Sequence, residues 1–437
     1  MSLNVKGEPR PALTLLVIIA IGIIVGIVIR SGNYFWLMVI PNTFALALTF
    51  VILFAYNAAG SYEKSSRKRL PDLSVIIPSY NSKSTIFKTL DAVKASKYPG
   101  KMEVIVVDDG STDGSRELLK TAEGIRLLVL EKNRGKAGAI NIALKGAKGE
   151  VVACVDSDSY PEPDAFAEAV SVLMEDSGIG VVSCFVKVAN PNNLLKKFQE
   201  IEFMTGFGFF QIGVHFLDAI SVAPGPTSIF RKSALEKVGG FDEHNITEDL
   251  EIVWRLRKNG YRIGHTPHAV IYTEVPGDLG SLFKQRIRWY RGIFYNVQKH
   301  ADLLFNPKYG LFSMLVLPFS FAGEFAGVAL SFSFAYITLA QLAWGAQYVW
   351  AAFSIGAPFS MVSAGPGVSA AAVVMGFMLV CPWILVVYLS YAIGGRDIGI
   401  LDIPVILLFF LFYGPLISLF YCITFLKEVN RSDYTWK

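Results

Sequence analysis

Three short apolar runs of the sequence are each followed by acidic or hydrogen-bonding residues. The runs are residues 74–77, 104–107 and 151–155, and the residues after them include Tyr80, Asp108, Asp109, Asp156 and Asp158. The pair Asp156 and Asp158 suits a metal-bound diphosphate, because hard Mg²⁺ or Mn²⁺ takes a carboxylate oxygen and uses substrate phosphates as further ligands. The alternative is that Asp108, Asp109 and Asp113 form a turn and cap the next helix, as aspartates commonly do, and the same alternative applies to the D-S-D pair.

A lysine and two acids stand at the starts of later helical patterns. Lys136 lies in N-R-G-K-A-G just before a helix, where a cation and backbone N–H groups could meet a phosphate, although an ordinary solvated lysine would fit there too. Glu248 and Asp249 follow Thr247, and a carboxylate there could act as a general base towards an acceptor hydroxyl. The alternative is that Thr247 is a helix N-cap with acids favoured in the first turn.

A basic segment near residue 288 carries an amide, a guanidinium and an aromatic ring. Gln285, Arg288 and Trp289 are three and four residues apart, so a helix would place them on one face. That face could bind a pyrophosphate and stack on a sugar ring. The alternative is a basic amphipathic helix that lies at a membrane surface.

Alternating strands and helices must position these residues. Apolar runs rich in β-branched residues predict strands at 74–77, 104–107, 127–130 and 151–155, and helical patterns lie between them at 84–95 and 136–147. This alternation predicts a mostly parallel, doubly wound α/β sheet of the Rossmann-like kind. Ligands of such sheets bind beyond the carboxyl ends of the strands, which is where the acidic residues lie.

The composition predicts a membrane protein. Of the 437 residues 53% are hydrophobic and 17% are charged, with a mean hydropathy of +0.45, whereas soluble domains carry about 25% charged residues. The net charge of +4 is too small to indicate a nucleic-acid partner. The four cysteines are far apart and indicate neither a disulfide framework nor a zinc site.

Hydropathy divides the chain into three parts. Residues 1–70 contain two predicted transmembrane helices, at about 13–30 and 35–56, and a basic linker that the positive-inside rule places in the cytoplasm. Residues 71–300 alternate between apolar and polar residues in the way that is typical of one soluble domain. Residues 301–437 predict an interfacial helix, three or four transmembrane helices and a short cytoplasmic tail. We therefore expect a multi-pass protein of the cell membrane with its catalytic domain in the cytoplasm.

The motifs together are more specific than any one of them. In chain order they are P-S-Y-N, V-V-D-D-G-S-T-D, D-S-D, T-E-D and Q-R-I-R-W. With transmembrane segments on both sides, this pattern resembles the processive, membrane-integrated family 2 glycosyltransferases of the GT-A fold, the group of hyaluronan, chitin, cellulose and poly-N-acetylglucosamine synthases. The segment Pro224 to Arg231 resembles the acceptor-side loop of this group, with Pro-Gly-Pro where small polar residues are more usual.

The resemblance implies a role for each donor-side residue. Tyr80, Asp108 and Asp109 would hold the nucleotide base and ribose, and Lys136 would meet the diphosphate. Asp156 would orient the nucleotide sugar. Asp156 and Asp158 would also hold the Mg²⁺ or Mn²⁺ ion.

The resemblance also implies roles for the residues of the later motifs, which would act on the acceptor side of the site. Asp249 would be the catalytic base with Glu248 beside it, and Gln285, Arg288 and Trp289 would bind the diphosphate and the acceptor end.

The expected activity is therefore inverting transfer of a sugar from a nucleoside diphosphate, UDP-N-acetylglucosamine or UDP-glucose first, to a growing polysaccharide, with export as a further possibility. A non-processive enzyme that glycosylates a polyprenyl phosphate or a diacylglycerol is the alternative, and a scaffold or transporter without catalysis is a third. The lipid bilayer is an expected partner, and the sequence does not indicate a protein partner.

Overall fold

A computed structural model describes residues 49, 69–318, 320, 339, 343–356 and 383–429. Apart from Thr49, which lies in a helix, the predicted spans at 13–30 and 35–56 fall outside the described residues. Most of the segment 319–382 falls outside them as well, so the predicted number of C-terminal spans stays a prediction.

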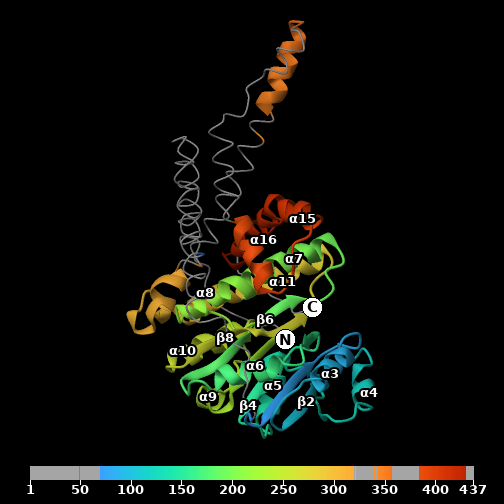
Figure 1. Ribbon diagram of the computed structural model, residues 1–437, viewed down its shortest axis with the longest axis vertical. Helices are drawn as coiled ribbons and strands as arrows, with labels where there is room; N and C mark the ends of the chain where they lie inside the picture. Colours follow the sequence, from blue (N-terminus) through green and yellow to red (C-terminus); the bar gives the residue numbers. More distant parts are fainter. Residues whose placement is uncertain are drawn as a thin grey trace.

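One mixed, mostly parallel sheet forms the centre of the described domain (Figure 1). Its strands are β1 (Leu73–Ser79), β2 (Met102–Asp108), β3 (Arg126–Val129), β4 (Val151–Val155), β5 (Ser159–Pro161), β6 (Ile179–Val188), β7 (Thr227–Arg231) and β8 (Arg262–Thr273). Their order across the sheet is β3-β2-β1-β4-β7-β6-β8-β5. Strands β3, β2, β1 and β4 are parallel, β7 runs antiparallel to β4 and β6, and β5 runs antiparallel to β8. All four predicted strand runs are confirmed.

Helices cover both faces of the sheet, as a doubly wound fold requires. One face packs against α3 (Ile86–Lys94), α4 (Ser115–Leu119) and α6 (Ala165–Leu173), and the other against α5 (Gly135–Leu144), α9 (Lys232–Lys237) and α10 (Glu248–Lys258). Side chains alternate between the two cores along a strand: Val75 and Ile77 of β1 point to the first face and Ile76 points to the second. Both helical patterns predicted from the sequence are confirmed by α3 and α5.

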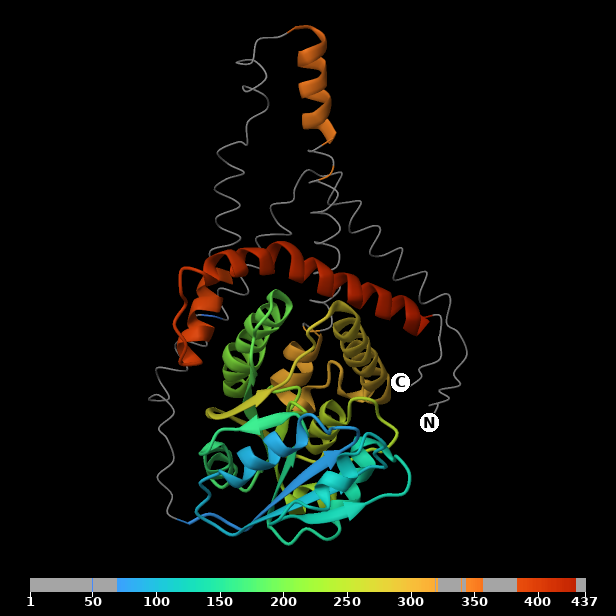
Figure 2. The ribbon, with the colours of Figure 1, turned by 90° about the vertical axis from the view of Figure 1, so that its right-hand side faces the viewer.

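A third group of helices packs beyond β6 and β8. It consists of α7 (Leu194–Phe203), the π-helical segment η1 (Met204–Phe210), α8 (Gln211–Phe216), α11 (Leu279–Lys299), α15 (Asp402–Leu408), the π-helical segment η5 (Phe409–Tyr413) and α16 (Gly414–Val429). Short helical segments at Ala301–Leu303, Pro307–Tyr309 and Phe312–Val316 follow α11. Figure 2 shows α16 running across α7 and α11.

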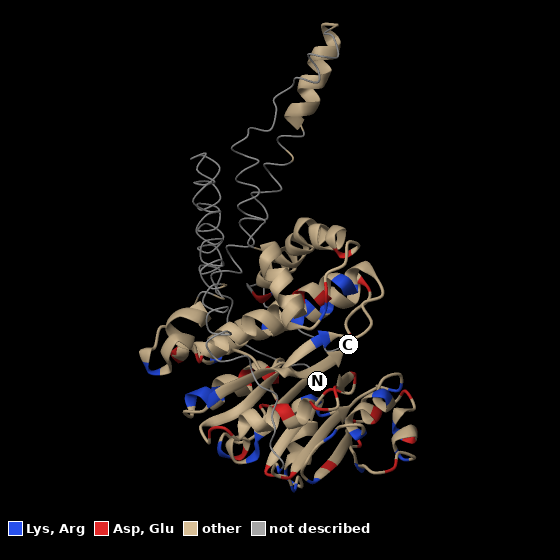
Figure 3. Ribbon diagram, in the orientation of Figure 1, with Lys and Arg blue, Asp and Glu red and all other residues tan. Residues whose placement is uncertain are grey.

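The continuous helix Asp402–Glu428 is long and apolar enough to cross a membrane, by length and composition. It is the one such helix among the described residues, and a shorter apolar helix occupies Trp383–Ile393. Figure 3 shows that the charged residues are spread over the sheet domain and are scarce on α15 and α16. Core helices of soluble proteins can pass the same test of length and composition, so the predicted multi-pass topology stays a prediction.

Candidate active site

The predicted donor residues meet at one edge of the sheet. Because β1, β2 and β4 are parallel, their carboxyl ends lie side by side, and Tyr80, Asp108 and Asp156 stand at these ends. The antiparallel strand β7 begins at the same edge, since Thr227 pairs with Val155 at the end of β4. The turn before β7 therefore reaches the site, where the N–H of Asp156 donates to the Pro226 carbonyl at 3.0 Å.

Lys136 is the centre of the cluster. Its ammonium lies 2.5 Å from Asp156 Oδ1 and 3.2 Å from Glu248 Oε1, and it donates to the Gly225 carbonyl at 3.2 Å. The N–H of Gly225 in turn donates to Asp249 Oδ2 at 3.0 Å. Helix starts at α5 and α10, the end of β4 and the turn before β7 thus converge on one point.

Charged side chains approach Gly225 closely. A Cβ atom there would lie 3.0 Å from the Lys136 Nζ atom and 3.1 Å from Asp249 Oδ2, so a side chain at this position would have to displace one of them by a few tenths of an ångström. From the sequence, this turn is expected only as an acceptor-side loop. The Pro-Gly-Pro pattern was the available signal, because a glycine held between two prolines indicates a rigid turn with no side chain at its tip.

The site holds more carboxylates than cations, which shifts their proton affinities. Burial raises the pKa of Asp156 to about 6 against the opposing effect of Lys136, and burial also raises the pKa of Asp158. Burial and the adjacent Glu248 raise the pKa of Asp249 to about 6, while Lys136 and Arg288 lower it. Burial favours a neutral Lys136, but the surrounding carboxylates outweigh burial and raise the pKa of its ammonium group. An additional cation would therefore be stabilised here.

Two carboxylates fit a divalent cation that shares its ligands with a substrate. Asp156 and Asp158 flank the turn between β4 and β5. Burial raises the pKa of both carboxyl groups, and Asp158 raises the pKa of Asp156 further. Among the residues that the structure describes, no cluster of three or more His, Cys, Asp or Glu side chains forms a complete protein site for a metal ion. Mg²⁺ and Mn²⁺ commonly take one or two carboxylates plus phosphate and water oxygens, so the donor set suits them.

Asp108 and Asp109 lie deeper, at the end of β2. Asp108 Oδ2 accepts from Arg116 Nε at 2.7 Å, and Asp109 Oδ1 accepts from the Arg134 N–H at 2.7 Å. Asp108 Oδ1 is buried and has no hydrogen-bond partner in the described part of the chain. Because a buried oxygen without a partner is costly, Asp108 is suited to accept a hydrogen bond from a ligand. Arg116, which orients this carboxylate, was not identified from the sequence.

The loops after β1 and β2 are held together by Asn81. Asn81 Oδ1 accepts from the Thr112 N–H at 2.8 Å, and the Asn81 N–H donates to Ser111 Oγ at 3.1 Å. Asn81 adopts a positive φ of 50°, which asparagine tolerates in tight turns. Its neighbour Tyr80 is 51% exposed at the mouth of the site.

Asp113 performs the structural role that was considered for the aspartates after β2. Its Oδ1 accepts from the Ser115 N–H at 2.9 Å and its Oδ2 from the Lys83 N–H at 2.9 Å. This carboxylate therefore joins the loop after β1 to the first residue of α4.

Helix α11 carries the last set of predicted residues. Arg288 is close enough to Asp249 to lower its pKa. Gln285 Oε1 is buried without a hydrogen-bond partner among the described residues. Trp289 packs against the apolar residues Val186, Val188, Phe203 and Val275, and the Arg286 guanidinium lies 4.1 Å from the centre of its ring. One face of the Trp289 ring is thus already covered by the chain itself.

Comparison with known proteins is consistent with this geometry. Residues 74–239 match the family described as Glycosyl transferase family 2. Poly-beta-1,6-N-acetyl-D-glucosamine synthase of Staphylococcus epidermidis is 34% identical over 232 residues, which make up 52% of this chain and 56% of that protein. The protein of the same name from Staphylococcus aureus strain COL is 35% identical over 226 residues, or 51% of this chain and 55% of that one. The match therefore spans a little over half the length of these relatives.

A solved structure shares the fold. A mannosyltransferase from Pyrobaculum calidifontis, in complex with GDP-Man and Mn²⁺, superposes with a TM-score of 0.53 at 22% identity and covers 89% of this chain and 99% of its own. At this identity the likeness describes the fold and not the substrate.

Proposed function

From the premise that this chain carries a family 2 glycosyltransferase domain, we propose that it is an inverting transferase that adds sugars from a nucleoside diphosphate to a growing polysaccharide. The observation that carries the proposal is the position of Asp249, which lies beside the Lys136–Asp156 pair and within electrostatic reach of Arg288. A base, a diphosphate-binding cation and an acidic pair are thereby assembled at one sheet edge.

The donor binds across the carboxyl ends of the strands in this proposal. Asp108 and Asp109 accept hydrogen bonds from the nucleoside, with Tyr80 at the mouth, and Lys136 binds the diphosphate. A divalent cation held by Asp156 and Asp158 would neutralise part of the diphosphate charge when bound. UDP-N-acetylglucosamine is the first candidate donor, because two relatives at 34% and 35% identity are named as poly-beta-1,6-N-acetyl-D-glucosamine synthases. UDP-glucose is the second.

Asp249 removes the proton of the acceptor hydroxyl in the proposed reaction. The acceptor oxygen forms a bond to the anomeric carbon on the side opposite the diphosphate, the bond from that carbon to the diphosphate oxygen breaks, and the configuration inverts. Arg288 and Lys136 stabilise the negative charge that develops on the departing diphosphate. Gln285 and Trp289 lie on the same helix as Arg288 and would contact the diphosphate or the acceptor end.

The proposed location is a membrane, with the transferase domain in the cytoplasm. The apolar helix Asp402–Glu428 supports this, because its hydropathy of 2.3 suits contact with lipid and only 17% of its most apolar window is buried.

The test is a radiolabel assay on the purified, lipid-reconstituted chain. A panel of UDP- and GDP-sugars is supplied with Mg²⁺ or Mn²⁺, and the product is sized on a gel. We expect one UDP-sugar to give a metal-dependent ladder or smear. Asp249→Asn should lose activity by on the order of 10²- to 10⁴-fold, which is the usual contribution of a general base. Asp91→Asn, an exposed aspartate on α3, is the matched control and should keep activity.

Three outcomes would change the assignment. A single small product that partitions into organic solvent would make the protein a lipid glycosyltransferase. Full activity of Asp249→Asn would remove the proposed base. Absence of turnover with every donor, by a folded protein, would overturn the enzymatic function.

A further inference from the structure

Helix α11 approaches the segment before Asp249 at a glycine. A Cβ atom at Gly292 would lie 2.2 Å from both Cγ2 and Oγ1 of Thr247 and 2.8 Å from its Cβ, whereas ordinary contacts begin at 3.4 Å. Gly292 and Thr247 are both buried. Any side chain at position 292 would therefore separate α11 from the start of α10 by about an ångström.

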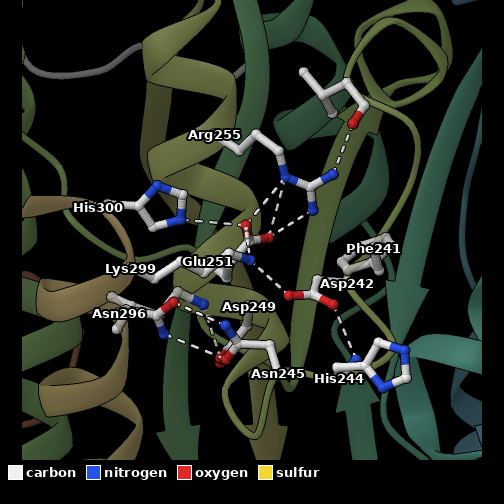
Figure 4. A network of polar contacts seen from close by, with 12 residues as sticks. Phe241, Asp242, His244, Asn245, Asp249, Glu251, Arg255, Asn296, Lys299 and His300 are labelled. Carbon is white, nitrogen blue, oxygen red and sulfur yellow. Dashed lines mark hydrogen bonds and ion pairs between the residues drawn. The ribbon is translucent and has the colours of Figure 1, made fainter. Parts of the chain in front are cut away.

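The amide of Asn296 joins the same two segments one turn further along α11. Its Nδ2 donates to Thr247 Oγ1 at 3.0 Å and its Oδ1 accepts from Asn245 Nδ2 at 2.8 Å. The Thr247 N–H donates back to Asn245 Oδ1 at 3.0 Å, so the three residues form a closed buried network. Figure 4 shows Asn296 and Asn245 facing each other below the start of α10, close to Asp249.

The two residues of α11 that make these contacts lie on the same face of the helix as Arg288, the proposed diphosphate-binding arginine. Arg288, Gly292 and Asn296 are spaced by four residues, which places them along one face of α11. Thr247 immediately precedes Glu248 and Asp249 in the chain. The contact of Thr247 with Gly292 and Asn296 therefore links the helix that carries Arg288 to the segment that carries Asp249.

A second polar network joins the same helices about one turn further along each. Glu251 of α10 is fully buried and accepts from Arg255 Nη2 at 2.5 Å, Lys299 Nζ at 2.9 Å and His300 Nε2 at 3.2 Å. Lys299 also donates to Asp242 at 2.6 Å (Figure 4). Because α10 and α11 are joined at two separate places, a change at the Gly292 contact cannot be absorbed by rotating one helix freely against the other.

We propose that Gly292 and Asn296 are positioning residues that set the distance between Arg288 on α11 and Asp249 on α10. Gly292 sets how closely the two helices approach, and Asn296 sets their register by hydrogen bonding. The inference rests on the proposed function, in which Asp249 is the base and Arg288 stabilises the leaving diphosphate. Neither positioning residue touches the donor pocket around Asp108.

The experiment compares steady-state kinetics of Gly292→Ala with those of Gly345→Ala in the lipid-reconstituted chain. Gly345 lies in a helix, and a Cβ atom there would meet no atom of the described residues within 4 Å, so it is a matched glycine control. We expect kcat of Gly292→Ala to fall roughly 100-fold, the cost of misplacing reacting groups by about an ångström, with the donor KM unchanged within about threefold. Gly345→Ala should behave as wild type.

A second-site variant separates positioning from loss of fold. In Gly292→Ala/Thr247→Ala the closest approach relaxes from 2.2 Å to the 2.8 Å of the Thr247 Cβ atom. An approach of 2.8 Å is still close, and the hydrogen bond from Asn296 to Thr247 is lost, so we expect only partial recovery. The kcat of the double variant should nevertheless exceed the value obtained by multiplying the two single effects, because the substitutions act on the same contact. Asn296→Leu, which keeps the bulk and removes the hydrogen bonds, should lower kcat with little change in donor KM, whereas the exposed Gln298→Ala on the same helix should not.

The outcomes distinguish the inference from the function on which it rests. Wild-type turnover together with equal kcat for Gly292→Ala and Gly345→Ala would overturn the positioning role. Multiplicative loss in the Gly292→Ala/Thr247→Ala variant would overturn it as well, since the two substitutions would then act independently. Absence of turnover by the wild-type chain would overturn the proposed function instead.

Discussion

The carboxyl group of Asp249 faces one like charge and two cations. Burial and Glu248 raise its pKa to about 6, and Lys136 and Arg288 lower it. A proposed base must be charged to accept a proton, so its useful range begins above its own pKa. Burial and neighbouring carboxylates raise the pKa of Asp156 to about 6 as well, while Lys136 lowers it. Arg288 is among the main groups that shift the pKa of Asp249, so its substitution probes that carboxyl group.

The pH dependence of kcat/KM should report this carboxyl group. We expect activity to fall as the pH is lowered through about 6, because Asp249 becomes protonated. Arg288→Ala removes a cation that lowers the pKa of Asp249, so the acidic limb of its residual activity should move to higher pH. Lys284→Ala, an exposed position on the same helix, is the control and should leave the limb in place. If the acidic limb does not move in Arg288→Ala, then Arg288 does not influence the protonation of the proposed base.

At the scale of elements, a buried ion pair joins three helices. Arg286 of α11 is 1% exposed and lies 2.6 Å from Glu202 Oε2 of α7, and Tyr413 of η5 donates to the same oxygen at 2.7 Å. Arg286 Nη2 also approaches the Tyr413 hydroxyl at 3.2 Å. A buried guanidinium that lost its carboxylate would be left as an uncompensated charge.

Removing that carboxylate should destabilise the helix group. We expect Glu202→Gln to lower the free energy of unfolding by roughly 2–3 kcal/mol, below the full cost of an unpaired buried charge because Glu202 is partly exposed. Thermal unfolding in detergent measures the change. Asp302→Asn breaks the more exposed pair with Lys258 and should cost less than about 1 kcal/mol. The double variant Arg286→Met/Glu202→Leu should recover most of the loss, and a larger loss in the double variant would contradict this account.

The strands, and the position of acidic residues at one edge of the sheet, could be predicted from the sequence because both depend on local patterns. Apolar β-branched runs predict β1, β2 and β4, and parallel strands place the residues after them, such as Asp108 and Asp156, at one edge. Gly225 could not be placed in this way, because its position depends on β7 running antiparallel between β4 and β6.

Contacts between distant segments could not be predicted from the sequence either. Arg286 and Tyr413 are 127 residues apart, and Asn245 and Asn296 are 51 apart. Residue types alone do not reveal such pairs, since each could equally face solvent or another helix. The residue types of the T-E-D and Q-R-I-R-W motifs suggest chemical roles by themselves. Gly292 and Asn296, which join the two motifs, do not, because their proposed role depends on packing.

At the scale of the whole molecule, the C-terminal helix presents a long apolar surface. No charged residue lies between Asp402 and Lys427. Six of its large apolar side chains are exposed: Ile403, Leu407, Leu411, Phe412, Leu419 and Leu426. Such a surface exceeds what soluble proteins leave open to water. The opposite side of the helix packs on α7 and α11 through Tyr413, Phe420 and Tyr421.

We expect this surface to contact lipid. Phe412→Trp is reconstituted in vesicles with and without brominated lipids, and we expect the brominated lipids to quench the added tryptophan strongly, above the background set by the seven native tryptophans of the wild-type protein. Phe87→Trp, an exposed position on α3 of the sheet domain, is the control, and its added tryptophan should not be quenched. Equal quenching of the two added tryptophans would place the helix away from the acyl chains.

Helix α11 is bonded on two sides, to α10 through Gly292 and Asn296 and to the C-terminal helix through Arg286 and Arg291. Each residue of a helix turns it by about 100°, so inserting or deleting one residue within this stretch would rotate one set of contacts away from its partners. Such a change would either detach the apolar helix or misalign Arg288 with Asp249. The length of this segment is therefore more tightly constrained than its composition, and homologous chains that preserve the chemistry should differ here by exchange of side chains and not by gaps.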